Sequence, residues 1–368
     1  MSPLRSATVT SLMAARGHEE VVFVADRESG LRGVIAVHST VLGPSLGGVR
    51  FWHYDSDHDA VADALALSEA MTLKAAVAGL QQGGGKAVVM WDDPDRRRPR
   101  ELLHALGRAI DGLDGRYLAA EDVGATPDDM NGLAEVTRWV TGRSEALGGS
   151  GDPSPVTAIG VLAAMRTVAR ALDGSSMLTG RRVVVQGAGH VGSHLARLLV
   201  EEGATVVVSD LLPARADAVA SELSATTVAH DRALVEPCDI LSPCALGDVL
   251  DDDSIPRLRC RAVVGAANNQ LGVIGADRAL AARGILYAPD FVVNAGGIIN
   301  IAQEFVGYDR ARAVEAATRI GDTLERVLAQ AAADNVTPLV AAERLARARL
   351  GGDRARSAQR MLPVWPSE

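Results

Sequence analysis

The stretch RRVVVQGAGHVGSHLARLLVEEGATVVVSD (181–210) decides how this chain folds. The apolar run RRVVVQ (181–186) predicts a buried strand, and GAGHVG (187–192) follows it at once. Apolar residues then recur at helical spacing, and ATVVVSD (204–210) predicts a second strand that ends in an acid. Strand, glycine loop, helix, strand and acid in this order predict a parallel α/β sheet with a loop that holds a dinucleotide.

Each glycine of this loop has its own physical task. Gly187 permits the tight turn, Gly189 lets the backbone approach a pyrophosphate, and Gly192 lets helix and strand pack closely. The pyrophosphate is expected at the helix N-terminus, where unpaired N–H groups and the helix dipole favour an anion. Asp210 suits the hydroxyls of the adenine ribose and repels a 2′-phosphate, which predicts NAD over NADP. The predicted cofactor loop is Gly187, Gly189, His190, Val191 and Gly192, in which His190 is an exposed spacer.

Composition narrows the class of protein. The chain has 368 residues, of which 48% are hydrophobic and only 3% aromatic, so it can bury two cores built from aliphatic side chains. A net charge of −9 argues against a nucleic-acid binder, and no basic amphipathic run indicates a membrane surface. No apolar stretch is expected to span a membrane, and the N-terminus lacks the apolar core of a signal peptide. The chain has three cysteines, Cys238, Cys244 and Cys260, and this small, odd number predicts reduced thiols in a cytoplasmic protein.

Strands that alternate with helices predict an α/β fold of two domains. A segment rich in Gly, Ser and Pro near 142–156 predicts the linker between them. We therefore expect an α/β substrate and oligomerisation domain over 1–145 and a Rossmann-type, doubly wound domain over 146–330. A C-terminal helix at 335–360 is expected to pack back on the first domain. Local patterns further predict a loop at 43–48, a helix over 59–79, a loop at 81–85, and strands at 86–91, 117–120, 238–244, 261–267 and 284–293.

Lysine is nearly absent from the chain. Of 37 basic residues only Lys74 and Lys86 are lysine, and they lie twelve positions apart. Arginine stays charged at any working pH, whereas a lysine that is buried or placed near another cation can lose its proton. One lysine can then hold a carboxylate while the other acts as a base, and Asp122, just after a predicted strand, adds a proton acceptor. These groups, with a nicotinamide cofactor, fit the oxidation of a substrate that carries a carboxylate and a protonated amine.

At this point the chain resembles the amino-acid dehydrogenase family that contains leucine, valine and phenylalanine dehydrogenases, relatives of glutamate dehydrogenase. The matching segments cover nearly the whole chain in order: LGPSLGGVRF (42–51), MTLKAAVAGLQQGGGKAVV (71–89), AEDVGATPDDM (120–130), GDPSPVTAIGV (151–161), VQGAGHVG (185–192), PCALG (243–247), VVGAANNQL (263–271) and GILYAPDFVVNAGGIIN (284–300). The resemblance implies a deep cleft between a substrate domain and a Rossmann domain. It also implies a homo-oligomer, a small-molecule substrate, NAD as cofactor and no resident metal.

The resemblance also implies roles for single residues. Lys74 resembles the lysine that binds the substrate carboxylate, and Lys86 the lysine that activates water for attack on the iminium carbon. Asp122 resembles the aspartate that exchanges protons with the amino group. Further positions match sites near the substrate or the nicotinamide: Gly47 by its backbone, Asn268 near substrate and ribose, Thr157 and Asn294 at the carboxamide, and Cys244 and Ala245 along the ring.

The side-chain pocket is expected to be apolar. Leu46, Ala120, Ile298 and Ile301 match its positions, and no cation is left to bind the distal carboxylate of glutamate. We therefore expect an aliphatic, branched-chain amino acid: leucine, valine or isoleucine. A phenylalanine dehydrogenase is the alternative within the family, and a catalytically inactive NAD-binding regulatory protein is the alternative outside it. Since one or two methylenes change selectivity by only about 1–3 kcal/mol, the sequence does not rank leucine against valine.

Overall fold

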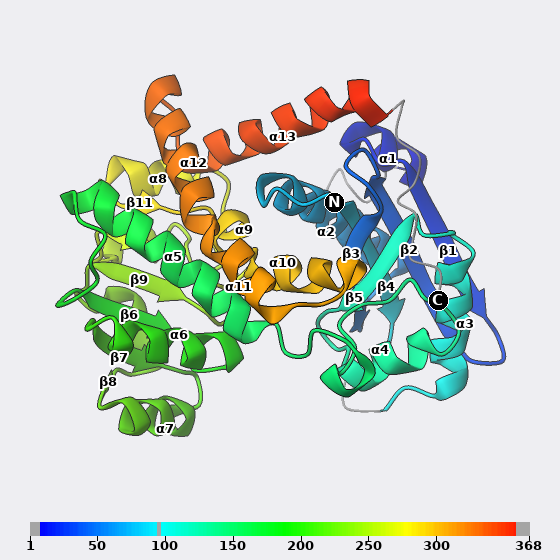
Figure 1. The fold of residues 1–368 in the computed structure, drawn as a ribbon, viewed down its shortest axis with the longest axis horizontal. Coiled ribbons are helices and arrows are strands. Elements are labelled where there is room, and N and C mark those ends of the chain that lie inside the picture. The colour runs from blue at the N-terminus through cyan, green and yellow to red at the C-terminus, as the bar shows by residue number, and fades with distance from the viewer. Residues whose placement is uncertain (1–7, 94–96, 358–368) are drawn as a thin grey trace. The chain divides into compact units, whose positions relative to one another are not determined.

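The computed structural model describes residues 8–93 and 97–357, with side chains up to residue 351, and its chain divides into two compact units (Figure 1). The described parts of Met1–Gly151, Ile301–Tyr308 and Ala346–Glu368 form unit 1. Unit 2 consists of Asp152–Asn300 and Asp309–Leu345. The two-domain α/β fold class that was expected is confirmed.

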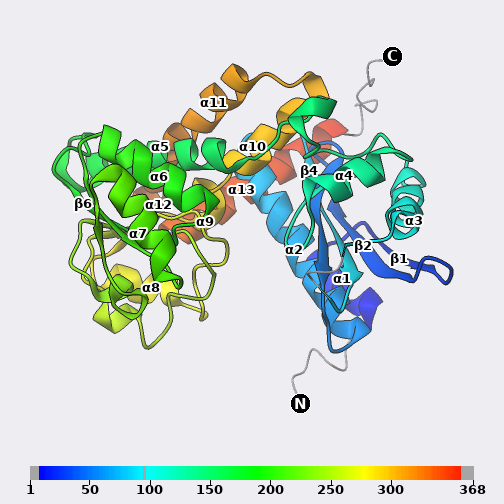
Figure 2. The same cartoon turned by 90° about the horizontal axis from the view of Figure 1, so that it is seen from below.

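Unit 1 is built on a mixed five-stranded sheet in the order β1-β2-β4-β3-β5. Strand β3 runs parallel to β4 and β5, whereas β2 is antiparallel to β1 and β4. Helices α1 and α2 cover one face of the sheet, and α3 and α4 lie on the other (Figure 2). The elements are α1 (Val9–Arg16), β1 (Glu20–Asp26), β2 (Leu31–Ser39), β3 (Ser45–Trp52), α2 (Asp57–Val77), β4 (Gly83–Met90), α3 (Arg100–Asp111), β5 (Tyr117–Glu121), α4 (Pro127–Ala134) and η2 (Glu145–Leu147).

Two predicted loops of unit 1 are in fact strands. The predicted loop 43–48 forms the start of β3, and the glycines of 81–85 form the start of β4. Glycine usually indicates a turn, but here the missing side chain serves close packing. A Cβ on Gly84 would lie 2.1 Å from the backbone N of Thr72 in α2, so the glycine lets the helix lie directly on the strand. Ser56 caps α2, and its side chain accepts a hydrogen bond from the Asp59 backbone.

Unit 2 contains a six-stranded, fully parallel sheet in the order β11-β10-β9-β6-β7-β8, which is a doubly wound arrangement. Its elements before the last sheet strand are α5 (Ser154–Asp173), β6 (Arg182–Gln186), α6 (His190–Glu201), β7 (Thr205–Ser209), α7 (Pro213–Leu223), β8 (Thr226–Thr227), η3 (His230–Val235), β9 (Ile240–Pro243), η4 (Ile255–Arg257), β10 (Ala262–Val263) and α8 (Ala276–Ala282). The chain continues with β11 (Leu286–Tyr287), α9 (Asp290–Val293), α10 (Gly296–Ala302), η5 (Gln303–Val306), α11 (Arg310–Thr318), α12 (Ile320–Asp334) and α13 (Pro338–Ser357). Of these elements, η5 and the ends of α10 and α13 fall in unit 1.

The sheet of unit 2 is buried on both faces. Val184, Leu241 and Val263 pack on one face with α8 and the short helices η3 and η4. Helix α6 covers the other face, and α5 packs against α6 and α12. By length and hydropathy α5 could cross a membrane, contrary to the expectation that no stretch would reach that length. Because 61% of the apolar stretch of α5 is buried inside the protein, we interpret α5 as a core helix of unit 2.

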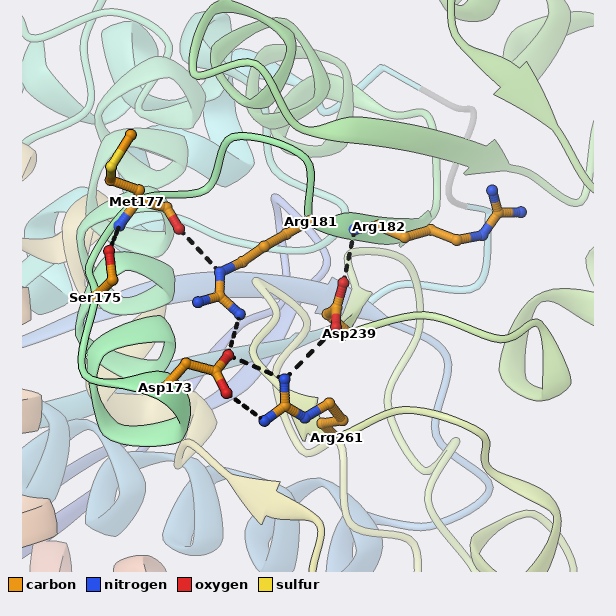
Figure 3. A network of polar contacts seen from close by, with 7 residues as sticks. All are labelled: Asp173, Ser175, Met177, Arg181, Arg182, Asp239 and Arg261. Carbon is orange, nitrogen blue, oxygen red and sulfur yellow. Dashed lines mark hydrogen bonds and ion pairs between the residues drawn. The ribbon is translucent and has the colours of Figure 1, made fainter.

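An ion-pair network joins the N-terminal ends of three strands in this sheet (Figure 3). Asp173, at the end of α5, accepts hydrogen bonds from Arg181 at 2.6 Å and from both terminal nitrogens of Arg261 at 2.7 and 3.0 Å. Asp239 accepts a hydrogen bond from the Arg182 backbone at 2.9 Å and lies 3.7 Å from Arg261. In α/β sheets the ligand binds at the opposite, carboxyl ends of the strands, so this network has a structural role.

The C-terminal part of the chain differs from its predicted outline. Instead of one strand over 284–293, the chain forms the two-residue β11 and then, after Pro289, the short helix α9. Residues 301–308 fall in unit 1, where the Glu304 carboxylate accepts the backbone N–H groups of Gly142 at 3.1 Å and Ser150 at 2.8 Å. The end of α13 also falls in unit 1, where the Arg349 guanidinium donates to carbonyls at the end of α2.

Candidate active site

The structure brings two of the predicted catalytic residues together in unit 1. Lys86 lies in the middle of β4, and Asp122 follows the end of β5. Lys86 Nζ is 2.7 Å from Asp122 Oδ2, and the Lys86 side chain is only 4% exposed. A lysine this deeply buried needs an anionic partner while it is charged, and Asp122, with 22% of its side chain exposed, provides one and still reaches solvent.

Sequence reasoning missed the third member of this cluster, Arg50 in β3. Its Nε donates to Asp122 Oδ2 at 2.9 Å, and its Nη1 donates to Asp63 Oδ2, also at 2.9 Å. The Tyr54 hydroxyl donates to that same Asp63 oxygen at 2.5 Å. Arg50 was visible as a lone cation inside the apolar strand that ends VRFW, but its partners come from α2 and β5 and are not near it in sequence.

The cluster lowers the pKa values of both Lys86 and Asp122. Burial lowers the pKa of Lys86, and Asp122 only partly offsets this effect, while the charge of Arg50 adds to it. Burial would raise the pKa of Asp122, but the charges of Lys86 and Arg50 outweigh it and hold that pKa below its usual value. The site therefore favours an ionised carboxylate beside a lysine that releases its proton more readily than a lysine in water.

Glycines make room for these charged groups. A Cβ on Gly48 would lie 2.4 Å from the Cβ of Asp122, and a Cβ on Gly85 would lie 2.6 Å from the ring of Tyr117. The Tyr117 hydroxyl donates to the carbonyl of Gly47 at 2.8 Å and so fixes the backbone that was expected near the substrate. The glycines of β3 and β4 are therefore required for the close packing around the Lys86–Asp122 pair.

The other predicted substrate residues lie as follows. Lys74 is half-buried in the last turn of α2. Leu46 and Ala120 are buried in β3 and β5. Ile298 is buried and Ile301 half-buried in α10, the helix at which the chain passes from unit 2 to unit 1. A shared pocket for these side chains remains a prediction.

The glycine loop in unit 2 has the geometry that a dinucleotide requires. Gly187 has a φ of 109°, and a Cβ on Gly192 would lie 1.8 Å from the Gly187 carbonyl oxygen. A Cβ on Gly189, by contrast, would meet nothing within 4 Å, so the space over this residue is open to a ligand. Gly189 precedes α6 without a side-chain cap, so no side chain of its own competes for the N–H groups at the start of the helix.

Asp210 and the neighbouring loop residues complete this end of the sheet. The Asp210 carboxylate accepts the backbone N–H of Ala188 at 2.8 Å and that of Leu212 at 2.9 Å, which fixes it at the end of β7 beside the glycine loop. His190 is 85% exposed and its Nδ1 lies 3.5 Å from Asp152, as expected for a spacer, and Val191 is half-buried. The residues present therefore fit a bound dinucleotide.

A second group of polar residues fits the nicotinamide end. Asn294 donates to Asn268 Oδ1 at 2.8 Å and to the carbonyl of Ala266 at 3.2 Å, while its own Oδ1 is buried without a partner among the described residues. Such an acceptor suits the amide N–H₂ of a carboxamide. The Thr157 hydroxyl donates to the Pro153 carbonyl at 3.0 Å, which leaves its oxygen as a further acceptor.

Cys244 and Ala245 follow the end of β9 beside the glycine loop. The Cys244 Sγ lies 3.4 Å from the Ser242 hydroxyl, and burial raises the pKa of the thiol. A thiol that stays protonated is a packing group and not a nucleophile. Ala245 is exposed, and its Cβ would lie 2.8 Å from a Cβ on Gly187. Within residues 8–93 and 97–351, whose side chains the structure describes, no cluster of three or more His, Cys, Asp or Glu side chains could hold a metal ion.

Comparison with known families matches both units. The family model described as "Glu/Leu/Phe/Val dehydrogenase, dimerisation domain" matches residues 18–139. That described as "Glutamate/Leucine/Phenylalanine/Valine dehydrogenase" matches residues 148–211 and 214–350. The chain belongs to this family. The predicted amino-acid dehydrogenase, with a nicotinamide dinucleotide as cofactor and a small-molecule substrate, is thereby confirmed at the level of the family.

Named relatives are similar along nearly their whole length. The chain is 46% identical to leucine dehydrogenase of Thermoactinomyces intermedius over 90% of this chain and 91% of that protein. It is 48% identical to valine dehydrogenase of Streptomyces virginiae over 92% of this chain and 95% of that protein. Among solved structures, L-tryptophan dehydrogenase from Nostoc punctiforme superposes with a TM-score of 0.83 at 38% identity, covering 93% of this chain and 98% of that one.

Proposed function

We propose that this protein catalyses the reversible, NAD-dependent oxidative deamination of a branched-chain L-amino acid to a 2-oxo acid and ammonia. The observation that carries the proposal is the buried Lys86–Asp122 pair, in which burial lowers the pKa of the lysine. It is supported by the glycine loop at 187–192 and by the similarity to leucine and valine dehydrogenases.

In this proposal each polar group has one task. Lys74 binds the substrate carboxylate as a fixed cation, and Asp122 accepts a proton from the substrate ammonium. The glycine loop would hold the pyrophosphate of the dinucleotide, Thr157 and Asn294 would hold its carboxamide, and the bound cofactor would supply the acceptor for the hydride of the α-carbon. Lys86 then takes a proton from water as the water attacks the imine carbon, and the carbinolamine that forms collapses to the 2-oxo acid and ammonia. Because the charged groups are already oriented, little reorganisation accompanies the chemistry.

The preference for NAD rests on Asp210. A carboxylate fixed beside the loop attracts ribose hydroxyls and repels a 2′-phosphate. We expect Asp210→Asn to raise KM for NAD roughly tenfold and to narrow the ratio of NAD to NADP activity, since a charge-assisted hydrogen bond and a repulsion are both lost. Initial rates with the two cofactors measure this ratio, and an unchanged ratio would remove Asp210 from the ribose site.

The branched-chain preference rests on the apolar side chains at Leu46, Ala120, Ile298 and Ile301. NAD reduction rates with leucine, valine, isoleucine, phenylalanine and glutamate test it directly. We expect the aliphatic substrates to be fastest and glutamate to be inactive. Ile298→Ala should raise activity on phenylalanine relative to leucine by about tenfold, since a larger pocket accepts the ring. If phenylalanine gives the highest rate of NAD reduction, the protein is a phenylalanine dehydrogenase. If the protein binds NAD but oxidises none of these substrates, the proposal that it is an enzyme is refuted.

We further infer a homo-oligomer in the cytoplasm. The description of the matched N-terminal family domain as a dimerisation domain supports the assembly. Light scattering on the purified full-length chain measures the mass of the assembly, and a monomeric mass across micromolar concentrations would refute the homo-oligomer.

A further inference from the structure

The Lys86–Asp122 pair has a third charged neighbour to which the proposed mechanism gives no task. Arg50 approaches the pair from β3, the strand between β4 and β5. Its Nε and Lys86 Nζ bind the same oxygen, Asp122 Oδ2, at 2.9 and 2.7 Å. Because both cations bind Oδ2, the other carboxylate oxygen of Asp122, Oδ1, takes no part in these two ion pairs.

Arg50 is itself held from its other side. Its Nη1 donates to Asp63 Oδ2 in α2, and the Tyr54 hydroxyl donates to the same oxygen. The side chains of Arg50 and Asp63 are 22% and 28% exposed. The polar contacts that link Tyr54 to Lys86 through these two side chains and Asp122 are therefore largely removed from solvent. A planar guanidinium suits this arrangement, because its fork joins two carboxylates along fixed directions, whereas one ammonium group does not.

We propose that Arg50 is a positioning residue that fixes the Asp122 carboxylate against Lys86 and that Asp63 and Tyr54 hold Arg50 in this place. Arg50 acts through Asp122 and needs no contact with substrate. The inference rests on the proposed function for its effect on rate, but the placement of the charges is independent of that function.

Charge and geometry give Arg50 a defined effect on titration. The groups that face the pair are Arg50 from β3, Asp63 from α2 and Tyr117 from β5, while Tyr54 from the loop after β3 faces Arg50 and Asp63. Burial raises the pKa of Tyr54 and of Tyr117, so both phenols stay neutral in the working range. Arg50 lowers the pKa of Lys86 and that of Asp122. Removing its charge should therefore raise both pKa values.

The chain allows this effect to be read without any substrate. Only Lys74 and Lys86 are lysine, so protein labelled with ¹³C at lysine Cε gives two signals, which Lys74→Arg and Lys86→Arg assign. In Arg50→Gln we expect the Lys86 signal to titrate about one pH unit higher than in the wild type, as for loss of a nearby charge. Arg50→Lys adds a third signal and should keep the wild-type titration of Lys86. An unchanged Lys86 titration in Arg50→Gln would overturn the proposal.

Kinetics supply the second readout. We expect Arg50→Gln to lower kcat at least tenfold with the acid limb of its pH profile moved upward, while KM for the amino acid stays within about twofold. In Arg50→Lys the acid limb of the pH profile should return to its wild-type position, but kcat should recover only in part, because one ammonium group cannot bind both Asp63 and Asp122. The matched control is Arg32→Gln, which removes an exposed ion pair with Asp57 in the same unit and should match the wild type.

Several outcomes would overturn the role of Arg50: a wild-type kcat in Arg50→Lys, a pH-independent loss in Arg50→Gln, or a rise in KM at constant kcat. If Arg50→Gln does not fold, Arg50→Lys still decides through its kcat. If the wild type oxidises no amino acid but the Lys86 titration moves as expected, the proposed function fails and the positioning by Arg50 stands.

Discussion

Asp122 and Asp173 each bind two cations, but in different surroundings. Asp122 lies between Lys86 and Arg50 in unit 1, where the Lys86 side chain is 4% exposed. Asp173 binds Arg181 and Arg261 at the N-terminal edge of the sheet in unit 2, where the side chains of Asp173 and Arg261 are 36% and 45% exposed (Figure 3). Both pKa values are lowered, but only Asp122 overcomes a large effect of burial that would raise it.

The two sites differ in the kind of cation that is paired with the aspartate. Asp173 is paired with arginines, which stay charged, so its network fixes structure over the whole working range of pH. Asp122 is paired with one arginine and one lysine, and the buried lysine can give up its proton. The same number of ion pairs therefore produces a structural clamp at one site and a proton-transfer site at the other. Substitutions at the two sites should differ sharply in their effects on activity.

The largest effect is expected from Lys86→Arg. The substitution keeps the positive charge beside Asp122 but removes the group that titrates, so we expect deamination to fall about 10³-fold, as for loss of a general base. The rate of NADH formation with the preferred amino acid measures the loss. Normal deamination by this variant would remove Lys86 from its proposed role.

Lys74→Arg is the matched control for that substitution. It makes the same change at the other lysine, which we expect to stay charged and bind the substrate carboxylate. KM for the amino acid should therefore rise more than kcat falls. Equal losses of kcat in the two variants would show that the division of tasks between the lysines is wrong.

Much of this site could be predicted from local sequence. The two lysines, Asp122 and the glycine loop stand in short motifs whose residue types have direct chemical reasons. Arg50 could not be placed, because its partners Asp63 and Asp122 come from two other parts of the chain and only the fold brings them together. The strand of residues 45–52 was missed because its glycines resemble a turn, whereas in the fold they permit Asp122 and β4 to approach. Packing, which local periodicity does not encode, decides these cases.

Asp122→Asn should have the next largest effect. It removes the proposed proton acceptor, and we expect kcat to fall about 10²-fold, at the lower end of what general acid–base catalysis contributes. Because the charge of Asp122 raises the pKa of Lys86, its loss should make Lys86 titrate at lower pH, the direction opposite to that expected for Arg50→Gln. The ¹³C titration of the two lysines measures both shifts. Shifts in the same direction would contradict the charge arrangement of the cluster.

The smallest effect is expected from Asp173→Asn, the corresponding change in unit 2. Activity should be unchanged, and Tm near pH 7 should fall by no more than about 2 °C, because the ion pairs of a carboxylate that is 36% exposed contribute little to stability. Hydrogen bonds from Arg261 and Arg181 lower the pKa of Asp173 below its ordinary 3.8, so the ion pairs stabilise the fold above that pH. As pH falls below 3.8 toward the lowered pKa, the wild type should progressively lose this advantage and the difference in Tm should begin to shrink. Thermal melts from pH 7 to pH 3 measure the trend, and a loss of kcat as large as that of Asp122→Asn would show that burial does not separate the two sites.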